Sequence, residues 1–304
     1  MGRPLRHSIP WQPVEITART VQGRYLLRPT LEINELILGV LGRAKERYGV
    51  RVYGIVVLSN HVHLIVAAAD ARTLSEFVGY FLGNVAREVG RVVDWRERFW
   101  GRRHSSIPIL SEEKLVERMR YLLANGVKEG LVRRPDQWPG VQIASVFTKE
   151  MALRGVWYNR TAEYEARRKG RKFHRHEFAT RYEIEIDPLP MWVSLDKVEQ
   201  KKRYVALIEK ATQDGQMEAR ACGRNPKGAD AVLRLSPDTR PEDTRRSAAP
   251  LCHADSREQY LSYRHAYRRF VEGYKDALVR WIETLREAEF PNNSLLPSLL
   301  ANTS

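Results

Sequence analysis

Residues 52–66 constrain the fold of this chain more than any other segment. An apolar run over residues 52–58 ends at a Ser-Asn dipeptide, which is typical of a tight turn, and a second apolar run covers residues 61–66. Side chains alternate between the two faces of a strand, so His61 and His63 share one face with Ile65. The other face carries Val62, Leu64 and Val66. We therefore predict a β-hairpin whose apolar face belongs to a hydrophobic core.

The histidine pair on this hairpin supports two interpretations. Two imidazoles that are two residues apart on one sheet face can both reach a single divalent ion. The alternative is that His61 and His63 are two partly exposed histidines on a sheet, without a ligand. The spacing alone leaves both interpretations open.

The elements around the hairpin predict an α+β fold. Residues 14–20 alternate between apolar and polar side chains, as a half-buried strand does. Apolar residues at helical spacing predict helices from Thr30 to Gly49 and over residues 73–90. The resulting β-α-β-β-α order predicts a sheet with helices on one face.

The charge of the chain indicates a polyanionic partner. Lys and Arg number 51 and Asp and Glu 37, a net charge of +14. An excess of this size favours nucleic acid, and the alternative is a basic surface that serves solubility. The two cysteines form no CxxC pair, which fits a reduced, cytoplasmic setting. Since no apolar run reaches about 18 residues, we expect no membrane partner.

Aromatic and basic side chains alternate in residues 95–104. The segment holds Trp95, Phe99 and Trp100 together with several arginines. Such a mixture suits phosphates and stacked bases, which makes the arginines candidate DNA contacts. These candidates are Arg98, Arg102 and Arg103. A buried aromatic plug with a solvated basic rim is the equally weighted alternative.

A helix is predicted from Ser111, a good N-cap, to Asn125, with Gly126 as its stop. One stripe of this helix is polar, at spacings of four, three and four residues. The stripe consists of Lys114, Arg118, Tyr121 and Asn125. A lone helical tyrosine usually packs at an amphipathic edge. Here the two cations and the amide on the same stripe favour a functional phenol.

Two segments together resemble a known family. Residues 59–66, Ser-Asn-His-Val-His-Leu-Ile-Val, resemble the HUH signature of IS200-like, single-tyrosine transposases. Phe99-Trp100 and residues 119–132 resemble the tyrosine helix of the REP-associated branch, and the Asp-Gln-Trp-Pro of residues 136–139 fits as well. The family usually has Asn-Pro where this chain has Asn-Gly at 125–126, and either residue ends a helix. The resemblance covers about residues 10–145.

The resemblance implies a ferredoxin-like HUH nuclease core with a metal and a nucleophile. By position, His61 and His63 are metal ligands, Asn125 is a third ligand and Tyr121 is the nucleophile. The ion is Mg²⁺ or Mn²⁺, which suits two imidazoles and an amide with open positions for phosphate and water. Lys114 and Arg118 lie where cations can activate the phenol, and together with Lys128 they are also candidate DNA contacts.

The implied function is metal-dependent cleavage and transfer of single-stranded DNA near hairpins, through a 5′-phosphotyrosine. The alternative is a domesticated protein that binds a DNA hairpin without cutting it. An RNA-binding ferredoxin-like domain would display aromatic residues rather than histidines on its sheet. A replication or conjugation nickase is a closer relative with a larger core or a differently placed tyrosine.

The rest of the chain carries no assigned chemistry. We predict a catalytic domain over residues 1–146 and a mostly helical extension over residues 147–304. Residues 167–176 form a dense basic run, including His174 and His176, and are expected to be a DNA-contacting or solvated loop. Helices are expected over residues 194–212 and 256–288, with a long flexible loop at 223–250 between them. The sequence does not decide between a monomer and a homodimer.

Overall fold

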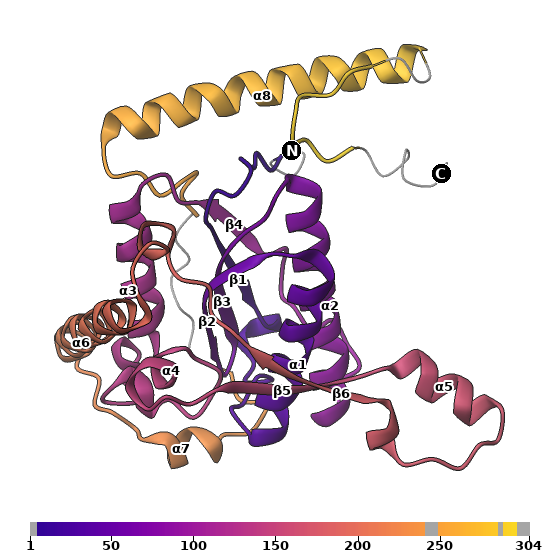
Figure 1. Ribbon diagram of the computed structural model, residues 1–304, viewed down its shortest axis with the longest axis vertical. Coiled ribbons are helices and arrows are strands. Elements are labelled where there is room, and N and C mark those ends of the chain that lie inside the picture. Colours follow the sequence, from indigo (N-terminus) through magenta and orange to yellow (C-terminus); the bar gives the residue numbers. More distant parts are fainter. Residues whose placement is uncertain (1–4, 241–248, 285–287, 297–304) are drawn as a thin grey trace.

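The computed structural model describes residues 5–240, 249–284 and 288–296 (Figure 1). Its α-helices are Leu31–Tyr48 (α1), Ala71–Val92 (α2), Glu112–Lys128 (α3), Ala144–Thr148 (α4), Arg160–Arg168 (α5), Lys197–Ala221 (α6), Ala229–Leu233 (α7) and Arg257–Thr284 (α8). Its strands are Val14–Arg19 (β1), Arg51–Leu58 (β2), His61–Ala67 (β3), Ser105–Pro108 (β4), Leu153–Tyr158 (β5) and Ala179–Ile184 (β6). The predicted β-α-β-β-α order is therefore confirmed from β1 to α2.

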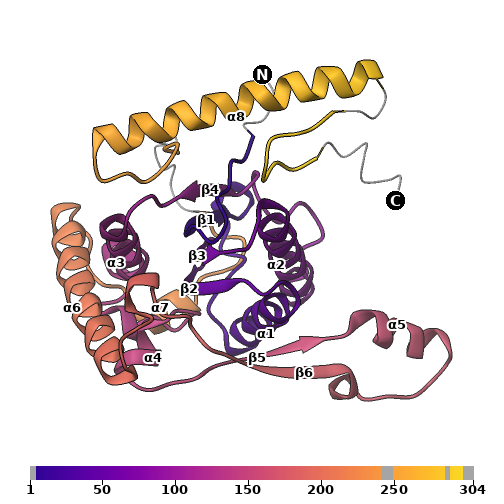
Figure 2. The same cartoon turned by 45° about the horizontal axis from the view of Figure 1, so that its top comes forward.

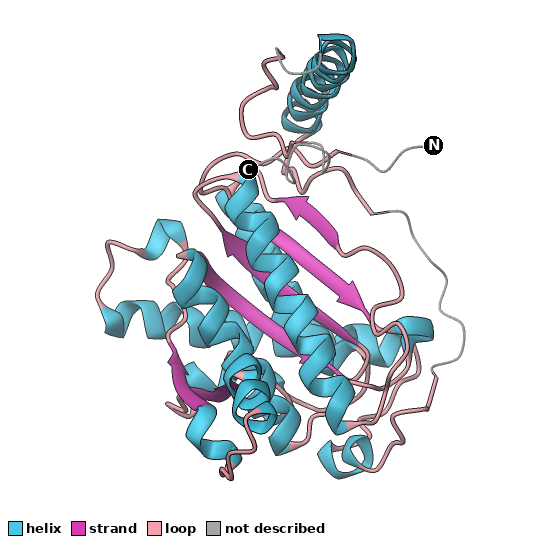
Figure 3. Ribbon diagram, turned by 90° about the vertical axis from the view of Figure 1, so that its right-hand side faces the viewer, coloured by secondary structure: helices cyan, strands magenta, loops and turns pink. Residues whose placement is uncertain are grey.

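The first four strands form one antiparallel sheet in the order β2-β3-β1-β4. Helices α1 and α2 cover one face of this sheet, and Figure 3 views the strands from that side. Helix α3 covers the other face, with α6 packed outside it (Figure 2). This arrangement confirms the predicted α+β, ferredoxin-like fold and lays the tyrosine helix across the sheet.

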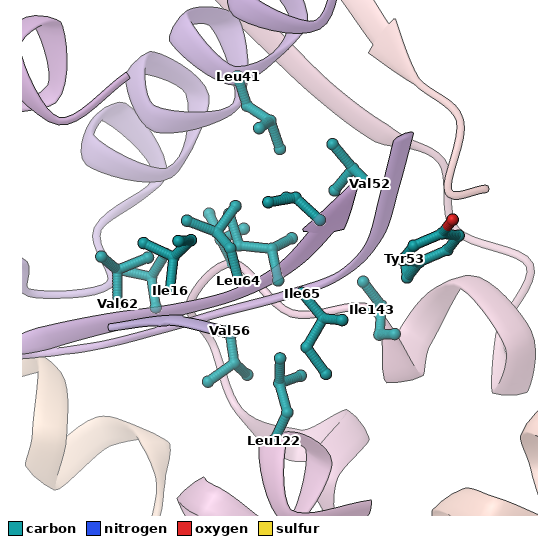
Figure 4. Close-up of a cluster of buried hydrophobic side chains, with 14 of the residues drawn as sticks. Ile16, Leu41, Val52, Tyr53, Val56, Val62, Leu64, Ile65, Leu122 and Ile143 are labelled. Atoms are coloured by element: carbon teal, nitrogen blue, oxygen red, sulfur yellow. The ribbon is translucent and has the colours of Figure 1, made fainter. Parts of the chain in front are cut away.

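The pairing of β3 with β1 sorts their side chains by face. Leu64 pairs with Ile16, and both lie on the apolar face beneath α1 and α2 (Figure 4). His63 pairs with Thr17 on the opposite face, the one that α3 covers. Figure 4 shows Leu122 of α3 approaching this second face of the sheet. The strand alternation therefore places the histidines between the sheet and α3, as the sequence predicted.

Helix α3 extends beyond its predicted end. Ser111 caps its start as expected, because its Oγ accepts a hydrogen bond of 3.2 Å from the backbone N–H of Lys114. The prediction that Gly126 stops the helix is wrong. Gly126 is buried within α3, where a Cβ would lie 3.3 Å from Val132 Cγ2. The chain instead leaves the helix at Gly130, whose φ of +66° is in the left-handed region that glycine tolerates.

Strands β5 and β6 form a two-stranded ribbon that crosses the outer side of α1 (Figure 1). The ribbon was not predicted from the sequence. Gly39 of α1 and Gly155 of β5 meet at the crossing, and a Cβ on either one would overlap the backbone of the other element. Two glycines at this point therefore allow the helix and the strand to approach closely.

The buried core continues past residue 146. Helix α6 packs along α3, and its Tyr204 and Ile208 belong to the same hydrophobic cluster as the sheet residues. The helix predicted over 194–212 is α6, which starts after the N-cap Asp196 and ends at Ala221. Beyond residue 212, Gly215 of α6 lies against Val127 of α3, at a close approach between the two helices.

The region predicted as a loop at 223–250 contains the short helix α7, so that prediction is wrong in part. Residues 241–248 of this loop lie outside the described residues. Helix α8 confirms the long helix expected from residue 256, and the predicted last turn falls on 285–287, again outside the described part. In the portion of the chain that the structure describes, no helix has the length and apolar composition needed to cross a bilayer.

Candidate active site

His61 and His63 lie side by side at the start of β3. His63 is only 7 % exposed, and His61 is partly exposed. Their ring centroids are 5.0 Å apart. The strand geometry therefore brings the two imidazoles together on one face, as both the spacing and the resemblance implied.

Hydrogen bonds from their Nδ1 atoms orient both rings. Nδ1 of His61 lies 2.6 Å from Asn60 Oδ1, while the Asn60 amide nitrogen donates to the carbonyl of Gly23. Nδ1 of His63 lies 3.1 Å from Thr17 Oγ1 and 3.3 Å from Glu15 Oε1. An amide oxygen and a carboxylate only accept, so each ring donates from Nδ1. Each Nε2 then keeps its lone pair, and hydrogen bonds to the other ring nitrogen typically orient the histidine ligands of metals.

The electrostatics around His61 favour its neutral form. Although His61 is partly exposed as a residue, loss of solvent around its ring is the largest cause that lowers the pKa of the imidazole well below its ordinary value. Three neighbours lower this pKa further, namely His63, Arg19 and Lys128. A neutral imidazole is the form that binds a metal, so the lowered pKa of His61 suits a metal ligand.

Tyr121 of α3 faces the histidines. Its ring centroid lies 6.1 Å from that of His63, in an edge-on arrangement. The guanidinium carbon of Arg118 lies 4.0 Å from the Tyr121 ring centroid, and the ammonium of Lys128 lies 3.7 Å from it. Both distances are typical of cation–π contacts, so two cations flank the phenol. The structure thus brings together three parts of the predicted site, namely the histidine pair of β3, Tyr121 and Arg118.

Asn125 lies one helical turn after Tyr121 and is 1 % exposed. Its amide nitrogen donates to the backbone carbonyls of Tyr121 and Leu122, at 3.2 and 3.3 Å. The amide oxygen is the atom that would bind a metal, and the assignment of Asn125 as a third ligand stays a prediction. Among the described residues, no group of three or more His, Cys, Asp or Glu side chains could hold a metal ion. The residues that would hold an ion are two imidazoles, oriented through their Nδ1 atoms, with an amide oxygen, and this metal site stays a prediction.

Glu15 is a central residue of the site that the sequence did not single out. It is 2 % exposed and accepts two hydrogen bonds from Arg118, at 2.8 and 2.9 Å. His253 Nε2 also donates to it, at 2.8 Å. Burial raises the pKa of the Glu15 carboxyl, but the hydrogen bonds from His253, His63 and Arg118 outweigh burial and hold this pKa far below its ordinary value. A charged residue in an alternating strand was the one available sign of Glu15, and nothing in the sequence pointed to His253.

The basic residues that the sequence predicted on α3 differ in their distance from the Tyr121 ring. Lys114 pairs with Glu117 at 2.6 Å on its own helix, so the cations beside the Tyr121 ring are Arg118 and Lys128. Lys128 is 6 % exposed, which is a buried position rather than the surface position expected of a DNA contact. Arg118 and Lys128 therefore both lie within the site.

The segment between α2 and β4 has an aromatic interior and a basic rim. Phe99 is buried, and the Trp100 indole N–H donates to the carbonyl of Leu82 at 2.9 Å. The three arginines predicted to contact DNA are exposed, namely Arg98, Arg102 and Arg103. The aromatic plug is thus confirmed for Phe99, and DNA contact by the three arginines stays a prediction.

Comparisons with known proteins find similarities to part of the chain. The family described as "Transposase IS200 like" matches residues 24–121. No protein with a curated description matches the chain. One similar solved structure is a REP-associated tyrosine transposase bound to a REP hairpin, at 18 % identity and a TM-score of 0.40, over 47 % of this chain and 82 % of that one. Another, described as a candidate transposase from Deinococcus radiodurans R1, is 17 % identical with a TM-score of 0.29, over 40 % of this chain and 95 % of that one.

The matched stretch contains three of the residues on which the resemblance depends, His61, His63 and Tyr121. Glu15, Lys128 and His253 lie outside it. The match supports a transposase role, and the similarity of residues 24–121 to the IS200-like transposases confirms the resemblance read from the sequence.

Proposed function

We propose that this protein is a transposase that cleaves and rejoins single-stranded DNA near hairpins, with Tyr121 as its nucleophile. The observation that carries the proposal is the position of the Tyr121 ring, 6.1 Å from the His63 ring and flanked by Arg118 and Lys128. A phenol used only for packing needs neither a pair of oriented imidazoles nor two cations at its ring. This arrangement suits nucleophilic attack on a phosphodiester.

In the cleavage step, the Tyr121 oxygen attacks the phosphorus in line with the bond to the 3′ oxygen. The new phosphorus–oxygen bond forms as the bond to the 3′ oxygen breaks, which leaves a 5′-phosphotyrosine and a free 3′-OH. The phenol loses its proton to solvent, and the leaving oxygen gains one. Because the number of phosphoester bonds does not change, a second 3′-OH can reverse the step and join strands without ATP.

The side chains around Tyr121 have separate roles in this step. Arg118 and Lys128 stabilise the negative charge that develops at the phenol oxygen and the phosphate. Glu15 holds Arg118 in place through two hydrogen bonds. His61 and His63, with Asn125, would hold Mg²⁺ or Mn²⁺, and that ion when bound would withdraw charge from the non-bridging phosphate oxygens.

A denaturing gel with end-labelled hairpin DNA tests the proposal. The protein is mixed with the DNA in Mn²⁺ or in EDTA, with the label on either end. A 5′-phosphotyrosine retains the 3′ part of the strand, so we expect a protein-linked band only with the 3′ label and only in Mn²⁺. Tyr121→Phe removes this band, whereas the matched control Tyr164→Phe, which changes an exposed tyrosine of α5, retains it.

Two results would overturn the proposal. A covalent band that persists in Tyr121→Phe would mean that another residue is the nucleophile. A shift on a native gel without any covalent product, across hairpins and both metal conditions, would favour the hairpin-binding protein that does not cut.

A further inference from the structure

The C-terminal region contributes a side chain to the site. His253 precedes α8, and its backbone pairs with the segment that follows β4. The His253 N–H donates to the carbonyl of Pro108 at 2.9 Å, and the His253 carbonyl accepts from the N–H of Leu110 at 2.9 Å. Two backbone hydrogen bonds therefore fix the position of His253 at the edge of the sheet.

From this position, His253 reaches the buried carboxylate of Glu15. Its Nε2 lies 2.8 Å from Glu15 Oε2, the oxygen that also accepts from Arg118 Nε. The other oxygen, Oε1, accepts from Arg118 Nη2 and lies 3.3 Å from His63 Nδ1. Both oxygens of Glu15 are thus engaged by side chains from β3, α3 and the C-terminal region.

Glu15 connects the two halves of the site. It contacts His63, one of the two imidazoles, and Arg118, one of the cations beside Tyr121. The contact with His63 is the longest that Glu15 makes, at 3.3 Å. Without the hydrogen bond from His253, the carboxylate is free to turn toward Arg118, and the His63 contact is the first to be lost.

We infer that His253 is a positioning residue of the site: by holding Glu15, it keeps His63 oriented toward a bound ion and Arg118 against Tyr121. This inference rests on the proposed function. It makes the site depend on Glu15 and His253, which both lie outside the stretch that matches the transposase family.

The test compares His253→Leu, which removes the N–H donor, with His253→Gln, which retains one. The first readout is Mn²⁺ binding without DNA, followed by the electron paramagnetic resonance signal of free Mn²⁺. We expect about tenfold weaker binding for His253→Leu, the lower end for losing a hydrogen bond that supports a metal ligand, and near-parent binding for His253→Gln. The control His265→Leu, an exposed histidine of α8, is expected to bind as the parent does.

The second readout is the split between turnover and DNA affinity in the cleavage assay. Because His253 acts through His63 and Arg118, we expect His253→Leu to lower kcat with little change in KM for the DNA. Glutamine restores kcat. Equal impairment of His253→Leu and His253→Gln, or parent-like Mn²⁺ binding and kcat in His253→Leu, would overturn the inference.

A third measurement uses the parent protein and does not depend on a variant folding. Long-range ¹H–¹⁵N spectra of the histidines should show His63 protonated at Nδ1 and His253 at Nε2. The opposite tautomer at His253 would overturn the inference.

The inference and the proposed function can fail separately. If Mn²⁺ binding depends on His253 but no covalent DNA product forms in the parent, the proposed function fails and the positioning of His63 is supported. A parent protein that binds no Mn²⁺ overturns both.

Discussion

Lys128 places its ammonium 3.7 Å from the centre of the Tyr121 ring, from a buried position two turns further along α3. A buried lysine next to a phenol is a cation held where negative charge would develop. We predict that Lys128→Met, which keeps the length of the side chain, lowers the rate of covalent product formation about tenfold or more. DNA affinity, measured by gel shift, should change little, because the ammonium is not at the surface.

Lys114→Met is the matched control for this prediction. Lys114 lies on the same helix but pairs with Glu117 instead of the Tyr121 ring. Equal losses of rate in the two variants would mean that both act through general charge rather than through contact with the phenol.

His61→Ala should abolish the metal-dependent product while the protein stays folded. The imidazole is neutral in the folded protein, because burial lowers its pKa. Its removal therefore leaves no unpaired charge, and the main loss is the hydrogen bond to Asn60, about 1 kcal/mol. Urea unfolding measures the stability, and the denaturing gel measures the product. An unfolded variant would indicate instead that His61 has a structural role.

Stability should fall in mild acid because of His104. Burial, followed by the charges of Arg6 and Arg103, lowers the pKa of His104 to about 3. The unfolded chain has the ordinary histidine pKa of about 6.5, so it binds a proton that the folded protein does not bind between about pH 6.5 and 3. His104 therefore does not affect the free energy of unfolding above pH 6.5. As the pH falls below 6.5, it lowers that free energy by at most about 1.4 kcal/mol per pH unit.

His104→Gln should flatten this pH dependence in chemical denaturation at pH 7, 6 and 5. The same change at His176, an exposed histidine, serves as the control. A parallel fall in stability for the parent and His104→Gln would contradict the assignment to His104.

Two glycine substitutions within helices should have opposite effects on stability. Gly39→Ala places a methyl group against the backbone of β5 and should destabilise the protein by about 2–3 kcal/mol. Gly79 on α2 is exposed and has open space around its Cβ position, so Gly79→Ala should stabilise by about 0.5–1 kcal/mol. Denaturant midpoints measure both. Stabilisation by Gly39→Ala would mean that the ribbon does not press on α1.

The basic segment after α5 should contribute to DNA affinity. It lies at the far end of the β5–β6 ribbon, which projects from the body of the protein (Figures 1 and 2). Arg168, Lys169 and Lys172 are exposed there. Replacing all three by Gln should weaken hairpin binding and reduce the slope of log affinity against log salt by up to about 2.7, at about 0.9 per lost phosphate contact.

Cations that already pair with acids are the control for this prediction. Lys201 pairs with Glu150, and Arg203 pairs with Glu199. Their replacement by Gln should change the slope less, because each is already partly neutralised. An unchanged slope for the triple variant would show that the segment is a solvated surface.

Local patterns in the sequence were sufficient for much of the fold. The alternation of β3 placed His61 and His63 on one face, and the helical stripe placed Arg118 on the same side as Tyr121. These predictions hold because the periods of two and 3.6 residues follow from backbone geometry within a few residues. The end of α3 was misplaced, since Gly126 is tolerated within the helix by its packing against Val132.

Tertiary structure alone decided which distant residues complete the site. Lys128 was predicted only as a candidate DNA contact, and the packing of α3 on the sheet buries it against Tyr121. The hydrogen bond between His253 and Glu15 has no local signal, because it depends on how the C-terminal segment pairs beside β4. The sequence by itself determined the elements from β1 to α2, the start of α3, the helices α6 and α8, and the histidine and tyrosine candidates. The contacts that orient them join segments far apart in the chain, and their partners are set by packing of the whole fold rather than by backbone periodicity.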